Sequence, residues 1–388
     1  MFSRRVPAPA QPNALTRRLQ ERRAAGGRII DLTLSNPTRA GIRYPEGLLA
    51  PLADAAALRY EPHPFGLATA RAAVAADHRR RGVEVDPGRV VLTASTSEAY
   101  TWLFKLLCEP GDIVLVPQPS YPLFEHLTML EGVGVAGYAL EYHGRWQIDF
   151  GGLEGAPANT RAILLVSPNN PTGSYVSREE YERVATLCAQ RGWALVADEV
   201  FADYCLEAAS PSTDIAAREL PCLAFTLGGL SKSVGLPQLK LGWIVVGGPG
   251  RARDEAMERL ELIADSFLSV STPVQVAAPA LLAAGAQVRE EIQARVAGNL
   301  ETLQAVARRF PACDILRAEG GWSAVVRVPA LRSEEQLVLE LLERDGILVH
   351  PGYFFDFRQE AYVVVSLLPP ADVFGDAVTR LLMRATTV

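Results

Sequence analysis

The strongest constraint on the fold is a series of short apolar runs that lack polar alternation and are separated by stretches of helical periodicity. Strands of this composition are covered on both faces, as in a parallel sheet with helices on each side. The sequence therefore predicts an α/β fold with a doubly wound, mostly parallel sheet of seven strands. The expected strands are residues 90–93, 113–116, 133–139, 162–166, 194–197, 223–227 and 243–246, and the expected helices are residues 97–108, 121–131 and 177–190.

A chain of 388 residues is too long for one small core, and its pattern changes in the last third. Two long helical patterns, at residues 251–267 and 274–310, precede shorter apolar runs that are typical of a smaller α+β unit. We predict a large domain at residues 41–270 and a small domain at residues 271–388, joined by the N-terminal arm, residues 1–40. The small domain is expected to hold strands at residues 324–328, 347–349 and 362–368, a helix at residues 333–344 and another after Asp372.

Composition limits the partners of the chain. A formal net charge of −6 gives no basic field for nucleic acid or an anionic membrane surface, so small molecules are the expected partners, and no metal site is predicted. Five cysteines without a C-x-x-C pair favour packing roles in a reducing compartment. No stretch approaches the roughly 20 apolar residues of a membrane span. We expect a cytoplasmic protein; the Arg-rich N-terminus leaves an organelle transit peptide as an alternative, which its prolines disfavour.

Lys232 lies in a loop rich in Gly and Ser that follows an expected strand. A lysine in this position can be partly desolvated, which lowers its pKa and frees the amine to form a Schiff base. Taken alone, the segment is more typical of a solvated surface lysine.

Two polar residues follow other expected strands. Asp198 ends the run 194–197, at the edge of the sheet where open α/β folds bind ligands, and its carboxylate can keep the ring nitrogen of pyridoxal phosphate (PLP) protonated. Asn170 follows the run 162–166 and can donate to a phenolate oxygen. The alternatives are a helix cap or surface aspartate, and a plain turn.

A phosphate site is expected where the first strand meets its helix. Ser95 and Thr96 lie at this junction, where backbone N–H groups and hydroxyls can hold a phosphate, although such residues are also common helix caps. Tyr121 can stack on a flat ring, or can be a core or turn tyrosine.

Four motifs carry a specific resemblance. Their order and spacing are similar to those of fold-type I PLP enzymes of the class I/II aminotransferase family, from about Asp31 to the end of the chain. The resemblance implies a PLP-transferase fold and a transferase that moves an amino group from an amino acid or amine to a 2-oxo acid through a Lys232 aldimine. The motifs are P-S-Y-P at residues 119–122, N-N-P-T-G at 169–173, D-E-V-F at 198–201 and S-K-S-V-G-L-P-Q-L-K-L-G-W at 231–243.

The resemblance also implies roles for single residues. It implies a homodimer, because one tyrosine of the pattern reaches the phosphate of a neighbouring subunit. A plain turn is an equal interpretation of Asn36, which falls in the loop that covers the substrate. The implied catalytic residues are Lys232, as cofactor lysine and proton carrier, and Asp198, at the pyridine nitrogen; the other implied residues are Asn170 near the ring oxygen and the substrate, Tyr121 stacked on the ring with Val200 beneath it, Ser95, Thr96 and Lys240 at the phosphate, Tyr60 at the neighbour's phosphate, and Asn36 at the substrate.

Three departures from the family pattern concern the cofactor. Phe201 replaces the usual tyrosine, so one hydrogen bond to the ring oxygen is missing and the aldimine pKa is expected to rise. Lys240 replaces an arginine and loses its bidentate fork. Gly229 stands where a phosphate-binding serine is common.

A fourth departure concerns the substrate. Relatives carry an arginine for the substrate carboxylate in a Y-x-R-x-S pattern, and the matching residues 362–366 have Val364 at that position. Either another cation binds the carboxylate, with Arg39, Arg43 and Arg358 as candidates, or the substrate has no carboxylate there.

Three other functions remain alternatives. The first is a PLP-dependent lyase, oxidase or other carbanion chemistry in specialised metabolism, which the departures at Phe201 and Val364 favour. The second is a non-catalytic ligand sensor, although the chain has neither spare length nor a basic face for a DNA-binding domain. The third is a dinucleotide-binding fold, which lacks support because no G-x-G-x-x-G follows the first strand.

Overall fold

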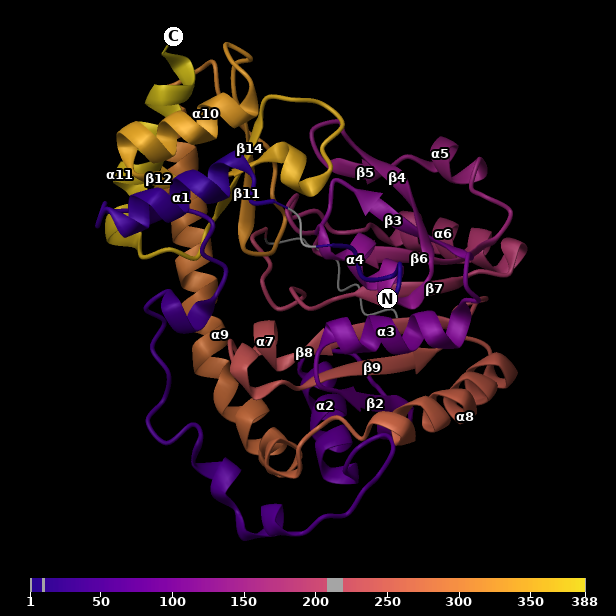
Figure 1. Cartoon of the computed structure of the whole chain (residues 1–388). Helices are drawn as coiled ribbons and strands as arrows, with labels where there is room; N and C mark the ends of the chain where they lie inside the picture. The colour runs from indigo at the N-terminus through magenta and orange to yellow at the C-terminus, as the bar shows by residue number, and fades with distance from the viewer. Residues whose placement is uncertain (1, 9–10, 208–218, 388) are drawn as a thin grey trace.

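The computed structural model describes residues 2–8, 11–207 and 219–387, and its largest element is an eight-stranded sheet (Figure 1). The strand order is β2-β9-β8-β7-β6-β3-β4-β5. Each neighbouring pair from β8 to β4 is parallel, whereas β9 and β5 run in the opposite direction. The mostly parallel sheet predicted from the sequence is confirmed. Its strands are β2 (Val90–Thr93), β3 (Ile113–Gln118), β4 (Gly134–Tyr142), β5 (Trp146–Ile148), β6 (Thr160–Val166), β7 (Ala194–Asp198), β8 (Ala224–Gly229) and β9 (Gly242–Gly247).

The eighth strand, β5, was not expected. It has three residues, of which Trp146 and Ile148 are buried, and it folds back antiparallel onto the end of β4. Strands β2, β7, β8 and β9 are buried at every residue, which explains their unbroken apolar runs.

Helices pack on both faces of the sheet and form its two cores. Helices α3, α4 and α8 contribute to the core on one face, and α5 and α6 to the core on the other. The predicted capping box of α6 is present, because Ser177 accepts from the Glu180 N–H while the Glu180 carboxylate accepts from the Ser177 N–H. These helices are α3 (Thr96–Leu107), α4 (Leu123–Glu131), α5 (Phe150–Glu154), α6 (Arg178–Arg191) and α8 (Gly250–Phe267); α2 (Ala68–Arg80) and the four-residue α7 (Leu230–Ser233) complete this part.

A helix of 36 residues, α9 (Thr272–Ala307), leads from the large sheet to a second group of elements (Figure 1). It contacts α2 and α7 on one side and α11 on the other. The second group holds an antiparallel sheet in the order β10-β11-β14-β13, and a parallel pair, β1-β12, that joins the N-terminal segment to it. Its elements are α1 (Ala14–Ala24), β1 (Ile30–Asp31), β10 (Asp314–Ile315), β11 (Ser323–Arg327), α10 (Glu334–Glu340), β12 (Ile347–Leu348), β13 (His350–Pro351), β14 (Tyr362–Ser366) and α11 (Ala371–Thr386).

Helix α10 is shorter than expected, because after Glu340 the chain continues as a π-helical turn, Leu341–Asp345, that ends at Gly346 with φ +66°. In the described part of the chain no single helix is both long and apolar enough to cross a membrane; α8 and α9 reach that length and composition only as a pair bent by 119°.

Candidate active site

Four of the residues singled out in the sequence follow neighbouring parallel strands at one edge of the large sheet. Asp198 is the last residue of β7, and Lys232 lies in α7, which begins directly after β8. Asn170 follows β6 and Tyr121 follows β3, the next two strands in the sheet. Because these strands are parallel, their carboxyl ends share an edge, and the structure brings the four residues there.

The side chain of Lys232 ends over two aromatic rings. Its Nζ lies 5.2 Å from the centroid of the Phe201 ring and 4.7 Å from that of Trp322. Burial lowers the pKa of Lys232 to about 8, although the charge of Asp198 acts in the opposite direction. A lysine with this pKa is partly neutral near pH 8 and can then act as a nucleophile or a base.

Asp198 is a buried carboxylate with two hydrogen-bond donors. The hydroxyl of Tyr100, on α3, donates to Oδ2 at 2.8 Å, and the N–H of Val200 donates to Oδ1 at 3.1 Å. Burial raises the pKa of Asp198, and these two bonds and Lys232 oppose the rise. Since a carboxylate accepts more than two hydrogen bonds, Asp198 retains capacity for a further N–H donor.

Three long side chains bind carbonyl groups of the turn that carries Lys232. The hydroxyl of Tyr204 donates to the carbonyl of Lys232 at 2.5 Å, Nη1 of Arg289 donates to that of Ser233 at 3.3 Å, and the hydroxyl of Tyr44 donates to that of Gly235 at 2.6 Å. Sequence reasoning missed these donors because each bond joins segments 28 to 191 residues apart and leaves no local pattern.

The charge of Arg289 is balanced by an ion-pair network that is buried at Arg289 and Asp77 and reaches the surface at Arg80. Its Nη1 lies 3.5 Å from Oδ1 of Asp77. Arg80 pairs with the same aspartate at 3.2 Å and also with Asp203. The network holds two guanidinium groups and two carboxylates, so the buried Arg289 is not without a counter-charge.

The start of α3 lies beside this edge, because β2 neighbours β9, which neighbours β8. Oγ of Ser95 accepts from the N–H of Glu98 at 3.2 Å. The Glu98 carboxylate is occupied by the N–H of Ala94 at 2.6 Å and the hydroxyl of Ser269 at 2.5 Å. The N–H groups of Thr96 and Ser97 precede the first bonds within the helix and are oriented to bind an anion.

The backbone is tightly packed where β8 and β9 end. Gly229 and Gly242 are paired across the two strands, and Gly242 is also paired with Thr93. A Cβ at Gly229 would come within 3.2 Å of the Leu241 carbonyl oxygen, so a side chain there requires β9 to move by a few tenths of an ångström. Lys240 is exposed, with φ +53°, at the end of a short turn before β9.

The small sheet contacts both the Asn170 turn and the N-terminal segment. Ser323 on β11 and Ser366 on β14 are paired; Oγ of Ser323 donates to Oδ1 of Asn170 at 3.4 Å, and Oγ of Ser366 donates to the Leu34 carbonyl at 2.6 Å. Asn36 lies two residues further along, and its Oδ1 accepts from the N–H and hydroxyl of Thr38.

Val364 is a buried apolar residue on β14. It is paired with Val325, is 3% exposed, and packs in a cluster with Trp146 and Phe355. The three arginines considered as replacements for an arginine at this position, Arg39, Arg43 and Arg358, are all exposed, and Arg43 pairs with Glu291 at 3.5 Å.

Two tyrosines singled out in the sequence are exposed. Tyr121 is 46% exposed and Tyr60, in the segment before α2, is 73% exposed. Phe201, in contrast, is buried and contacts Trp322 edge to face, with ring centroids 5.3 Å apart.

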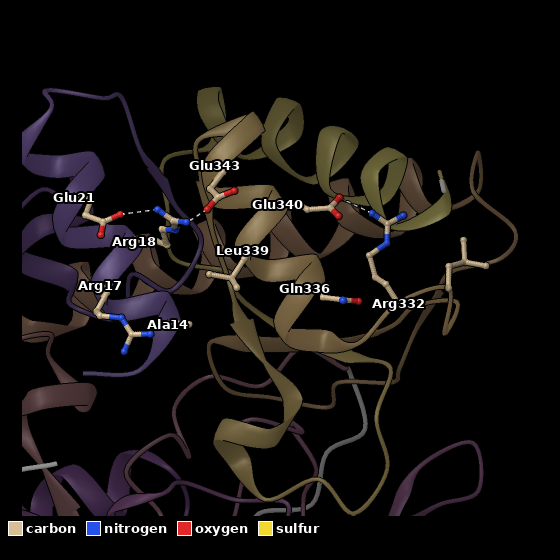
Figure 2. Close-up of a pocket in the computed structure, with 10 residues that line it drawn as sticks. Ala14, Arg17, Arg18, Glu21, Arg332, Gln336, Leu339, Glu340 and Glu343 are labelled. Carbon is tan, nitrogen blue, oxygen red and sulfur yellow. Dashed lines mark hydrogen bonds and ion pairs between the residues drawn. The ribbon is translucent and has the colours of Figure 1, made fainter. Parts of the chain in front are cut away.

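A groove of about 690 Å³ lies elsewhere, between α1 and α10, and contains none of the residues singled out above (Figure 2). Within the groove Arg18 pairs with Glu21 and Glu343, and Arg332 pairs with Glu340. The groove is therefore separate from the sheet edge that carries Lys232.

The polar groups at the sheet edge fit PLP, the cofactor that the sequence resemblance implies. Lys232 offers an amine of lowered pKa, Asp198 a buried carboxylate with acceptor capacity, and the first turn of α3 a set of N–H groups for a phosphate. In the described residues no group of three or more His, Cys, Asp or Glu side chains is arranged to hold a metal.

Comparisons with known proteins identify the family of the chain. Residues 43–373 match the sequence profile described as aminotransferase class I and II. The chain is 26% identical over 385 residues to the glutamate-pyruvate aminotransferase AlaA of Haemophilus influenzae, covering 97% of this chain and 94% of that protein. It is 27% identical over 376 residues to an alanine aminotransferase of Mycobacterium tuberculosis, covering 92% and 86%.

The fold is also that of solved aminotransferases. The alanine aminotransferase from Pyrococcus furiosus superposes with a TM-score of 0.86 at 23% identity over 95% of both chains. A double mutant of Thermus thermophilus aspartate aminotransferase superposes with a TM-score of 0.84 at 23% identity over 99% of both chains.

Proposed function

Because this chain belongs to the aminotransferase class I and II family and is a PLP-dependent aminotransferase, we propose that Lys232 is the lysine that binds the cofactor and moves the substrate proton. The observation that carries the proposal is the position of Lys232 beside Asp198 at the edge of the sheet, with a pKa that burial lowers to about 8.

When bound, PLP supplies an electron-accepting ring that stabilises negative charge at the α-carbon of the substrate. Asp198 holds the ring nitrogen in its protonated form, which strengthens that acceptor. Lys232 Nζ would accept the α-proton as a base and return it as an acid, and the burial that lowers its pKa in the cofactor-free chain supports the first of these roles. We assign the phosphate to Ser95, Thr96 and Lys240.

The ring of the cofactor has neighbours of several kinds in this proposal. Tyr121 would stack on one face of this ring and Val200 would pack on the other. Asn170, which Ser323 orients, donates to the ring oxygen and the substrate, and Asn36 covers the substrate from the N-terminal segment. Phe201 offers no hydroxyl to the ring oxygen.

The relatives named for alanine, glutamate and pyruvate support small amino acids and 2-oxo acids as substrates. Val364 is buried and uncharged, so no arginine at this position of β14 can bind the substrate carboxylate. This supports a carboxylate contact from another part of the chain. The same observation favours a second candidate, an amine donor without an α-carboxylate.

The first experiment compares the wild type with Lys232→Ala after loading with PLP. We expect a visible absorption band in the wild type that the variant lacks. Borohydride should reduce the C=N bond in the wild type, so that the band disappears and the cofactor stays covalently attached to Lys232. Attachment of PLP to Lys105 or Lys240 instead of Lys232 would contradict the assignment.

The substrate follows from a second measurement on the loaded wild type. Alanine, glutamate and amines without a carboxylate are mixed with it in turn, and conversion of the cofactor to pyridoxamine phosphate is measured. Conversion by alanine or glutamate supports the amino acid assignment, and conversion by amines alone supports the second candidate. Release of ammonia or hydrogen peroxide, with no pyridoxamine phosphate, would contradict amino transfer and favour the lyase or oxidase alternative.

We also propose a homodimer in which Tyr60 reaches the partner's phosphate. Tyr60 is 73% exposed and Leu58 is 90% exposed, and the contact of such apolar groups with a second copy would remove them from water. We expect a dimer by light scattering, and Tyr60→Phe should weaken PLP binding without changing the dimer. A monomeric protein with full PLP affinity would contradict both statements.

Two further proposals concern the chain as a whole. We propose domain limits at residues 41–270, with residues 1–40 and 271–388 forming the smaller unit; the pairing of β1 with β12 supports this grouping. We propose a cytoplasmic location, which five free cysteine thiols support.

A further inference from the structure

The amine of Lys232 is surrounded in part by aromatic faces instead of hydrogen-bond acceptors. Its Nζ lies 4.7 Å from the centroid of the Trp322 ring and 5.2 Å from that of Phe201. Both distances are within the roughly 6 Å at which an ammonium is attracted to the face of a ring, and tryptophan is the strongest partner of this kind.

The two rings are held in place by other aromatic groups. Phe201 and Tyr204 both meet Trp322 edge to face, with centroids 5.3 Å and 5.0 Å apart. All three side chains are buried. Tyr204 also donates to the carbonyl of Lys232, so the aromatic group holds this residue at its side chain and at its backbone.

The other groups around Lys232 come from four elements. Asp198, at the end of β7, acts on the amine by its charge and is itself held by Tyr100 from α3. Arg289 from α9 and Tyr44 from the N-terminal segment bind carbonyls of the same turn and not the amine. The ammonium therefore has a carboxylate in its surroundings and two rings beneath it.

An aromatic face differs from a carboxylate in one respect that matters here. It attracts the charged amine but has no strong acceptor for the proton, so it does not hold the amine in a directed hydrogen bond. The amine can therefore rest on the rings as a cation and leave them without breaking such a bond.

We propose that Trp322 and Phe201 form a seat for the Lys232 ammonium in every state in which the amine is not bonded to the cofactor. This inference rests on the proposed role of Lys232. Trp322 is then a positioning residue, which keeps the released amine beside the reacting atoms instead of allowing it to turn into solvent.

The test uses the small number of lysines in the chain. Among the 38 cationic residues only Lys105, Lys232 and Lys240 are lysines. The cofactor-free protein is labelled with an amine-specific reagent from pH 6 to pH 11, and the rate at each lysine is measured by mass spectrometry. The midpoint of each pH profile gives the pKa, and the plateau gives the accessibility.

Trp322→Leu should lower the midpoint of Lys232 by about one pH unit, because the ammonium loses its best aromatic partner. Trp322→Phe keeps a weaker ring and should give a smaller shift in the same direction. Lys105 and Lys240 serve as internal references and should keep their midpoints. If the leucine variant is not folded, Phe201→Leu and Trp322→Phe carry the test.

If the midpoint of the Lys232 labelling profile is unchanged or raised in these variants, the proposed contact between the ammonium and the rings is wrong. This holds whatever happens to the plateau of the profile. The test does not depend on the cofactor, so it separates the two proposals. If borohydride fixes PLP on another lysine while the midpoint shifts as expected, the proposed function fails and the aromatic contact stands as a structural feature only.

Discussion

Tyr204 joins two parts of the environment of Lys232. Its ring packs against Trp322, and its hydroxyl donates to the Lys232 carbonyl. The side chain therefore contributes packing and one buried hydrogen bond, and these two contributions are separated by a change that removes only the hydroxyl.

Tyr204→Phe should lower the free energy of unfolding by about 1 kcal/mol, since a buried carbonyl loses its donor. It should also weaken PLP binding, because the turn that carries Lys232 loses one of its three side-chain contacts. Urea denaturation and equilibrium binding of PLP measure the two effects.

Tyr138→Phe is the matched control. Tyr138 is buried and its hydroxyl donates to the Leu164 carbonyl at 2.7 Å, within the large sheet. A similar loss of stability with unchanged PLP affinity is expected. Equal loss of affinity in the two variants would mean that Tyr204 acts through stability alone.

At the scale of the elements, the sequence predicted the strands well because their apolar runs are buried on both faces. It also predicted which polar residues end them: Asp198, Asn170 and the start of α3 lie where their strands indicated. The edge of a parallel sheet collects such residues whatever their distance along the chain.

The sequence could not predict contacts between elements that are distant in the chain. Trp322 lies in an ordinary G-G-W-S stretch, and only the fold brings it to Lys232. Tyr100 reads as a core residue of an amphipathic helix, yet it donates to Asp198. The short strand β5 and the π-helical turn after α10 were missed for another reason, since each is too short to show a period.

At the scale of the whole molecule, the partly buried amine of Lys232 links stability to pH. Burial lowers the pKa of Lys232 from its usual value of 10.5 to about 8. Between these two values the unfolded chain binds more protons than the folded chain, so stability should rise with pH across this window. Below about pH 8 the charged amine destabilises the cofactor-free protein by up to about 3 kcal/mol.

Lys232→Met should therefore stabilise the cofactor-free protein more at pH 7 than at pH 10. Urea unfolding at several pH values between 7 and 10.5 measures the difference. Lys240→Met, which removes an exposed lysine, should keep the slope of the wild type. Parallel profiles for the wild type and Lys232→Met would refute the link between this amine and stability.

The long helix α9 has a mechanical consequence. At 36 residues it is about 54 Å long, and Arg289 is its eighteenth residue, at the centre. If such a rod tilts about its centre by roughly 5°, its ends move by roughly 2 Å while the middle stays still. The Arg289 guanidinium, which donates to the Ser233 carbonyl, lies at this central point of the helix. The segment that carries Lys232 is thus bound to the part of α9 that such a tilt would displace least.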